Sequence, residues 1–93
     1  MREGFILGGS IIKIHGIINE LSDAEKKVAN FILQWPSEIS DLSIGNLSKR
    51  CWASEATIVR FCRAIGYSGF KDFKIDITRY MAYLDVNNKD NLS

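Results

Sequence analysis

Two helix starts lie close together in residues 43–66, and only a short connection separates the helices that follow them. Ser43 and Ser54 can each cap a helix, because a serine hydroxyl accepts a hydrogen bond from a free amide in the first turn. Apolar residues at helical spacing follow both serines, and Gly66 is typical of the position just after a helix. Two helices of about eight and about eleven residues, joined by about three, predict a helix-turn-helix.

The residues inside this pair fit the packing that a helix-turn-helix requires. The second helix must approach the first closely, and Ser48 is a small residue near the centre of the first helix. Ile58, early in the second helix, is placed to fill the gap between them, while Leu47 and Cys51 give the first helix an apolar face. These placements support a packed pair of helices.

The second helix has a polar face opposite its apolar one. With Ile58 taken as the inward direction, Ala56, Arg60 and Arg63 point the opposite way, and Thr57 flanks them. A core helix has no use for two arginines on its outer side. Small residues let a helix backbone enter a groove closely, and arginine can donate paired hydrogen bonds to guanine or to phosphate. This face therefore predicts contact with a nucleic acid.

Residues at the start of this helix and just after it are further candidate contacts. Ser54 and the free amides at the helix start suit a phosphate. Glu55 has two open roles, because it can stabilise the helix start through the macrodipole or accept a hydrogen bond from a cytosine amino group. The hydroxyls and lysines that follow suit backbone phosphates, although they also fit a polar loop with solvated lysines. They are Tyr67, Ser68, Lys71 and Lys74.

The N-terminal half of the chain is also helical in pattern. Isoleucines at helical spacing predict a helix over residues 11–20, which Gly16 weakens by about 1 kcal/mol relative to alanine. Ser22 and Glu25 predict a capping box at the start of the next helix, and Pro36 ends that helix. Its predicted apolar face consists of Val28, Phe31, Ile32 and Trp35.

Two further segments complete the pattern. Residues 36–43 predict one short helical turn with Ile39 and Leu42 pointing inward, and residues 70–84 predict a final amphipathic helix. No segment alternates with period two over a useful length, and no hairpin signal is present. The sequence predicts an all-α fold, a small bundle of five to six helices that contains the helix-turn-helix. The apolar positions of the final helix are Phe70, Phe73, Ile77, Tyr80, Met81 and Leu84.

The charge distribution distinguishes the same region. The 93 residues carry a formal net charge of +1, which gives no overall signal for a nucleic acid. The segment 49–74 is nevertheless clearly basic, while the segments before and after it are mildly acidic. A basic face of this kind suits an anionic partner, although the charges alone also fit an ordinary solvated surface.

Other function classes find little support. Cys51 and Cys62 are too few for a disulfide framework, and we expect both to be reduced core residues of a cytoplasmic protein. His15 has no sequence partner for a metal site or a catalytic triad, and the glycines of residues 4–10 lack the lysine of a phosphate-binding loop. We expect no enzyme activity, no metal and no cofactor. No apolar run is long enough for a bilayer and no signal peptide is indicated, so no membrane partner is expected.

Three stretches together resemble a known family. They are LSDAEKKVANFIL, SIGNLSKRC and SEATIVRFCRAIGYSGFKDFK, which lie between residue 21 and about residue 80. This combination resembles the N-terminal DNA-binding domain of the RpiR family of bacterial transcriptional regulators. The resemblance implies double-stranded DNA as the partner, and it places the family's DNA-contacting role on Ser54, Glu55, Thr57, Arg60 and Arg63.

The resemblance also implies a longer regulator. Full-length relatives carry a C-terminal sugar isomerase domain that binds phosphosugars, and they usually control genes of sugar phosphate or amino-sugar metabolism. We therefore expect residues 1–10 to be an N-terminal extension, residues 11–85 to be the DNA-binding domain, and residues 86–93 to begin a linker to an absent effector domain. A phosphosugar effector is expected only through that domain.

Trp52 and Ser48 depart from the family pattern. Trp52 stands at the turn position where the family prefers glycine or another residue that tolerates positive φ, and a tryptophan is strained in the left-handed conformation. Either the turn has a different shape, or Trp52 accepts the strain and stacks against a neighbour or the DNA backbone. Ser48 replaces the usual alanine and keeps the close approach of the helices.

The predicted function is sequence-specific DNA binding by a transcriptional regulator, as a homodimer on two half-sites. The isoleucine-rich stretch 11–18 has more apolar surface than a terminal helix needs, so we expect it to pack partly on the core and partly on a second protomer. The alternative is a helical interaction module whose basic face binds an acidic protein. The predicted DNA contacts are Ser43, Ser54, Glu55, Ala56, Thr57, Arg60, Arg63, Tyr67, Ser68, Lys71 and Lys74.

Overall fold

The computed structural model describes the backbone of residues 9–92 and the side chains of residues 9–86. Within this range every regular element is helical, which confirms the predicted all-α fold. The elements are α2 (Gly9–Ile17), the 3₁₀ helix η1 (Ile18–Glu20), α3 (Asp23–Gln34), the 3₁₀ helix η2 (Pro36–Asp41), α4 (Ile44–Cys51), α5 (Glu55–Ala64) and α6 (Phe70–Leu92).

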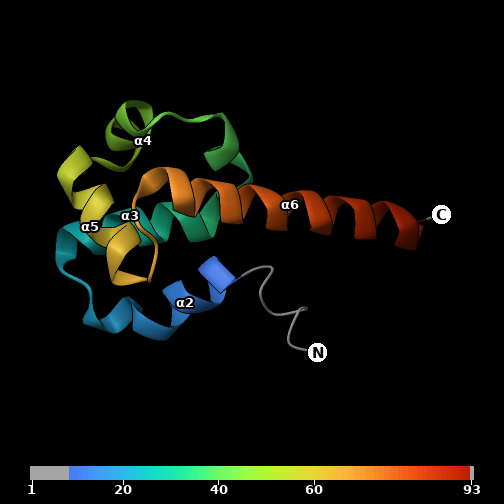
Figure 1. Ribbon diagram of the computed structural model, residues 1–93, viewed down its shortest axis with the longest axis horizontal. Helices are drawn as coiled ribbons and strands as arrows, with labels where there is room; N and C mark the ends of the chain where they lie inside the picture. Colours follow the sequence, from blue (N-terminus) through green and yellow to red (C-terminus); the bar gives the residue numbers. More distant parts are fainter. Residues whose placement is uncertain (1–8, 93) are drawn as a thin grey trace.

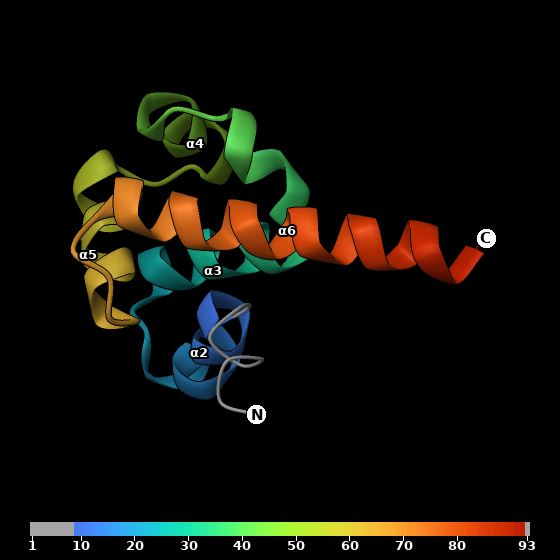
Figure 2. The same cartoon turned by 45° about the vertical axis from the view of Figure 1, so that its right-hand side comes forward.

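The helices form a small bundle from which one long helix projects. The helix α6 crosses the bundle and its C-terminal half extends beyond it, which gives the molecule dimensions of 42 × 26 × 20 Å. The helix α5 lies at the end of the bundle opposite this projection, and α4 lies along the adjoining side, above the start of α6 (Figures 1 and 2). The helix-turn-helix pair is therefore on the outside of the molecule, where a partner can reach it.

The core is one cluster to which every helix except η1 contributes fully buried side chains. Phe61 of α5 and Phe73 of α6 meet edge to face, with ring centroids 6.1 Å apart and an interplanar angle of 81°. Such an arrangement is worth about 0.5–1.5 kcal/mol beyond the area that the rings bury. It joins the second helix of the pair to α6. The largest fully buried side chains are Ile14, Ile32, Ile39, Leu47, Ile58, Phe61, Phe73 and Ile77.

A hydrogen bond to Asp76 of α6 holds the start of α2. The Ser10 amide donates to Asp76 Oδ2 at 3.2 Å, and the Tyr67 hydroxyl donates to the same oxygen at 2.6 Å. The helix begins at Gly9, two residues earlier than predicted, and it changes to a 3₁₀ helix at Ile18. The rest of the predicted N-terminal extension lies outside the described residues.

Two sequence predictions at helix ends are wrong. Trp35 was expected on the apolar face of α3 but is 45% exposed, because the backbone leaves the helical path at this residue, just before Pro36. The final helix was expected to end near Leu84 but continues to Leu92. Residues 85–92 are mostly polar but contain no glycine or proline, so nothing in the backbone chemistry ends the helix.

Candidate nucleic-acid interface

The two helices of the predicted helix-turn-helix are present, and each begins at the predicted serine. Ser43 Oγ accepts a hydrogen bond from the Asn46 amide at 3.1 Å, and Ser54 Oγ accepts one from the Thr57 amide at 3.0 Å. The remaining free amides at the two helix starts can donate hydrogen bonds to an anion. Both caps confirm the sequence prediction.

The turn between α4 and α5 is left-handed. Trp52 has φ 59° and ψ 42°, so the predicted alternative in which the turn has a different shape is wrong. The Ser48 carbonyl accepts hydrogen bonds from the amides of Trp52 and Ala53, and its hydroxyl donates to the Ala53 carbonyl. Ser48 was predicted to matter only for its small size. The structure shows that its hydroxyl also donates to the Ala53 carbonyl and closes the turn, which an alanine at this position could not do.

The helix α5 separates its residues into a buried and an exposed face. Ile58, Phe61 and Cys62 are fully buried, while Ser54, Glu55, Ala56, Arg60 and Arg63 are exposed. The exposure of Ala56, Arg60 and Arg63 confirms the outer face that the helical wheel predicted. It is the side of the helix-turn-helix that faces away from the bundle.

Thr57 lies in the interior instead of beside this face. It is only 4% exposed, so its predicted position at the edge of the outer face is wrong. Its hydroxyl is 2.9 Å from Ser54 Oγ and accepts a hydrogen bond from Arg60 Nη2 at 3.1 Å. Thr57 therefore connects the helix cap to the guanidinium group of Arg60.

A carboxylate from another helix also approaches Arg60. Glu25 Oε2 of α3 lies 4.0 Å from Arg60 Nε, while Glu25 Oε1 accepts the Ser22 amide in the predicted capping box. The Arg60 side chain is 61% exposed, so this long ion pair leaves the guanidinium group open to solvent. The sequence showed Glu25 only as a capping residue, because its contact with Arg60 depends on how α3 and α5 pack.

Glu55 extends toward the start of α4. A methyl group added at Gly45 would lie 3.4 Å from Glu55 Oε2 and 3.9 Å from Ser43 Oγ. The first turn of α4 contains no acidic residue of its own, so the Glu55 carboxylate lies near two positive helix starts. Of its two predicted roles, this position fits stabilisation of helix starts. The role of Gly45, which leaves room for the carboxylate, was not anticipated.

Hydrogen bonds join the end of α5 to the loop that follows it. Arg63 Nε donates to the Ser68 carbonyl at 3.2 Å, and the Ser68 amide donates to Asp72 Oδ2 at 3.0 Å. Gly66 has φ 97°, as expected for a residue just after a helix. Arg63 stays exposed at the surface, so its contact with the loop orients it in the same manner as Thr57 orients Arg60.

Tyr67 and Lys74, two of the residues predicted to contact phosphates, make contacts within the protein. Tyr67 donates to Asp76, and burial, together with this bond, raises the pKa of the phenol. Lys13 Nζ lies 4.6 Å from the centre of the Tyr67 ring. Lys74 Nζ donates to the Leu42 carbonyl at 2.9 Å and lies 5.7 Å from the centre of the Phe70 ring. Lys71, in contrast, is exposed.

Cys51 and Cys62 are free and buried. Among the side chains that the structure describes, no three or more histidines, cysteines or carboxylates form a group that could hold a metal ion. No described helix is long and apolar enough to cross a membrane. Burial raises the pKa of the Cys51 thiol to about 11 and that of the Cys62 thiol to about 12, so both are protonated at neutral pH. A protonated buried thiol is a poor nucleophile.

Comparison with known proteins agrees with this arrangement. Residues 9–83 match the model of a family described as "Helix-turn-helix domain, rpiR family". An uncharacterized HTH-type transcriptional regulator of Haemophilus influenzae is 37% identical over 84 residues, which are 90% of this chain and 27% of that protein. The HTH-type transcriptional regulator HexR of Pseudomonas aeruginosa is 40% identical over 70 residues, 75% of this chain and 25% of HexR. The chain thus spans about a quarter of the length of these relatives.

A solved structure gives the same fold. The NanR protein of Vibrio vulnificus, complexed with ManNAc-6P, superposes with a TM-score of 0.75 at 27% sequence identity. The match covers 86% of this chain and 31% of the NanR chain. The helical bundle described above is therefore also found as one part of a longer protein.

Proposed function

The chain belongs to the rpiR family of helix-turn-helix domains, which are DNA-binding domains of transcriptional regulators, and from this premise we propose how its residues contact DNA. The helix α5 enters the major groove, and Arg60 contacts base edges. The observation that carries this proposal is the Ser54–Thr57–Arg60 chain of hydrogen bonds, which fixes an exposed guanidinium group on the outer side of α5. A guanidinium group held in this way can donate two hydrogen bonds to guanine.

The remaining contacts position the domain on the phosphates. The free amides at the starts of α4 and α5, beside Ser43 and Ser54, face the DNA backbone, and Lys71 and Ser68 contact it beyond the end of α5. Arg63 contacts a base or a phosphate next to Arg60. Ala56 lets the backbone of α5 approach closely. Tyr67 and Lys74 support these contacts through their bonds to Asp76 and Leu42.

Glu55 and Thr57 act through the protein. The Glu55 carboxylate lies near Gly45 at the start of α4, and Thr57 is buried beneath Arg60. Glu55 therefore adjusts the charge at the two helix starts, and Thr57 sets the direction of Arg60. Both affect DNA binding without touching a base.

The whole regulator acts in the cytoplasm as a homodimer on two half-sites and responds to a phosphosugar. Two half-sites suit two copies of a helix-turn-helix. The related NanR structure contains ManNAc-6P, and the matches cover only about a quarter of each relative's length. A further domain of a longer chain would bind the effector, and the regulated genes would serve sugar phosphate or amino-sugar metabolism.

Fluorescence anisotropy tests the proposal directly. Duplexes from upstream of the protein's own gene are titrated with the wild-type domain and with Arg60→Ala, at several salt concentrations. We expect Arg60→Ala to lose about 1–3 kcal/mol on the specific duplex and much less on random DNA. Lys71→Ala should weaken binding to both duplexes similarly and reduce the dependence of the affinity on salt.

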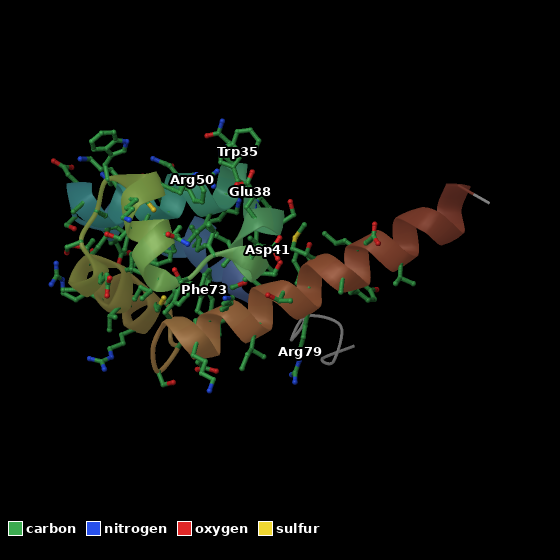
Figure 3. All side chains as sticks on the ribbon, turned by 90° about the horizontal axis from the view of Figure 1, so that it is seen from above. Trp35, Glu38, Asp41, Arg50, Phe73 and Arg79 are labelled. Carbon is green, nitrogen blue, oxygen red and sulfur yellow. The ribbon has the colours of Figure 1, made fainter. Side chains whose placement is uncertain are left out.

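Arg79→Ala is the matched control. It removes the same charge from an exposed position on α6, pointing away from the bundle (Figure 3). If no duplex binds better than random DNA, and Arg60→Ala behaves like Arg79→Ala, the basic face has another use. An acidic protein partner would then explain it better.

A further inference from the structure

Trp52 combines an unfavourable backbone with an exposed side chain. It is the only residue other than glycine with positive φ in the part of the chain that the structure describes. Its side chain is 84% exposed, the highest value among the large apolar residues described. Glycine adopts this conformation without steric cost, while a side chain with a Cβ does not. The fold alone would therefore be better served by glycine at this position.

The turn does not depend on the indole. The Ser48 carbonyl accepts the amides of Trp52 and Ala53, and the Ser48 hydroxyl donates to the Ala53 carbonyl. These bonds involve only Ser48 and the backbone. Because the indole is left mainly in water, the sequence-based alternative in which it stacks against a neighbour in the chain is not supported. A strained residue of this kind points to a contact outside the chain.

Three basic side chains lie around the indole. Trp52 borders two hollows, one shared with Lys27, Phe31 and Arg50 and the other with Ser48, Lys49 and Ala53. Arg50 pairs with Glu38 and lies 5.1 Å from the centre of the Phe31 ring, so Lys27 and Lys49 contribute most of the local positive charge. Three basic side chains beside one exposed indole suit an anionic partner.

Trp52 is also close to the proposed DNA contacts along the chain. It lies two residues before Ser54, the cap of α5, whose free amides face a phosphate in the proposed function. We propose that Trp52 packs against the sugar–phosphate backbone of the bound DNA, beside the bases that α5 contacts, with its indole N–H donating to a phosphate oxygen. A flat apolar ring with one polar donor suits a deoxyribose next to a phosphate. This inference rests on the proposed function and adds a contact to it.

Fluorescence can observe Trp52 alone. The chain has two tryptophans, so Trp35→Phe leaves Trp52 as the only indole, and Trp52→Phe leaves Trp35. Trp35 is the comparison indole. It follows Gln34, which borders the same hollow as Trp52, while Glu25, at the other end of α3, approaches Arg60. The helical rise places Trp35 about 15 Å along the axis from Glu25. Figure 3 shows Trp35 at the outer edge of the bundle.

We expect specific duplex DNA to protect Trp52 from quenching by acrylamide and to leave Trp35 as accessible as before. Trp52→Gly should raise the melting temperature, because it removes the backbone strain, and yet weaken DNA binding about fivefold to tenfold, or about 1–1.4 kcal/mol. The slope of affinity against salt should stay unchanged, since Trp52 carries no charge. A gain in stability together with a loss in affinity cannot come from damage to the fold.

Three results would overturn the inference. One is that Arg60→Ala weakens specific binding while Trp52→Gly does not, which leaves the proposed function intact. Another is that Trp52 stays equally accessible to acrylamide in the complex. A third is that Trp52 becomes protected as protein concentration rises without DNA, which identifies a second copy as its partner. If Arg60→Ala has no effect and no duplex is preferred, the proposed function itself fails.

Discussion

Thr57 Oγ1 accepts a hydrogen bond from Arg60 Nη2 at 3.1 Å, and the two residues lie three positions apart on α5. The first is buried and the second is exposed, so a threonine that no partner can touch controls the direction of an arginine that a partner can reach. A side chain held in one direction loses less conformational entropy when it binds. The pair therefore links the packing of the helix to its capacity to contact DNA.

Replacing Thr57 by valine should separate these two functions. The shapes are similar, so the free energy of unfolding should change by no more than about 1.5 kcal/mol. Specific DNA affinity should fall about threefold to tenfold, because Arg60 loses its bond, while affinity for random DNA should stay nearly constant. Anisotropy with both duplexes measures this ratio. Thr57→Ser keeps a hydroxyl and serves as the control; equal losses on both duplexes for Thr57→Val would contradict the positioning role.

We expect the Ser54 cap of α5 to stabilise the folded domain. Ser54→Ala removes the acceptor of the Thr57 amide and the partner of the Thr57 hydroxyl, so it should lower the free energy of unfolding by about 1 kcal/mol, within a range of 0.5–2 kcal/mol. Urea denaturation followed by circular dichroism measures the change. Ser40→Ala, at an exposed position of η2, should stay within about 0.5 kcal/mol of the wild type. An equal loss in both variants would show that the Ser54 cap has no special role.

Alkaline pH should destabilise the domain through its buried thiols. Burial first, and Asp72 second, raise the pKa of Cys62 from 9.0 to about 12, and the unfolded chain has the ordinary value. Above about pH 9 the unfolded state loses a proton that the folded state keeps, so the free energy of unfolding falls as pH rises. The slope is at most about 1.4 kcal/mol per pH unit for each such group.

Cys62→Ala tests this origin. The variant loses packing and is less stable at every pH, but its stability should decline less steeply than that of the wild type between pH 9 and pH 10.5. Urea titrations at each pH measure both slopes. The remaining slope should come from Cys51, whose pKa burial raises to about 11, and from Tyr67. Parallel curves for the variant and the wild type would exclude Cys62 as a source.

Local signals in the sequence predicted local structure well. Ser22, Ser43 and Ser54 each cap a helix where the sequence placed the caps, and Gly66 has the positive φ expected of it. These features depend on residues three or four positions apart, so the chemistry is visible in a short window. The division of α5 into two faces followed from the helical period for the same reason.

Features that depend on packing were not predicted. Thr57 lies at the edge of the wheel, where a small rotation of α5 against its neighbours decides between burial and exposure. The approach of Glu25 to Arg60 requires the packing of α3 on α5, which no local pattern contains. The bond from Lys74 to the Leu42 carbonyl joins residues 32 positions apart. The contacts of the candidate site with DNA itself stay predictions until binding is measured.

Ile12 provides a test of the proposed dimer. Ile14 of the same helix is fully buried, while Ile12 is 61% exposed, so α2 presents one large apolar side chain away from the core. Covering such a side chain contributes up to roughly 1.5–3 kcal/mol. Ile12→Asp should therefore weaken self-association at least tenfold, because a charge would have to be desolvated in the interface. Ile75→Asp, at a position 45% exposed on α6, introduces the same charge and should leave association unchanged. Sedimentation velocity over a concentration series measures both, and a wild-type chain that stays monomeric at the highest concentration would argue against α2 as the dimer contact.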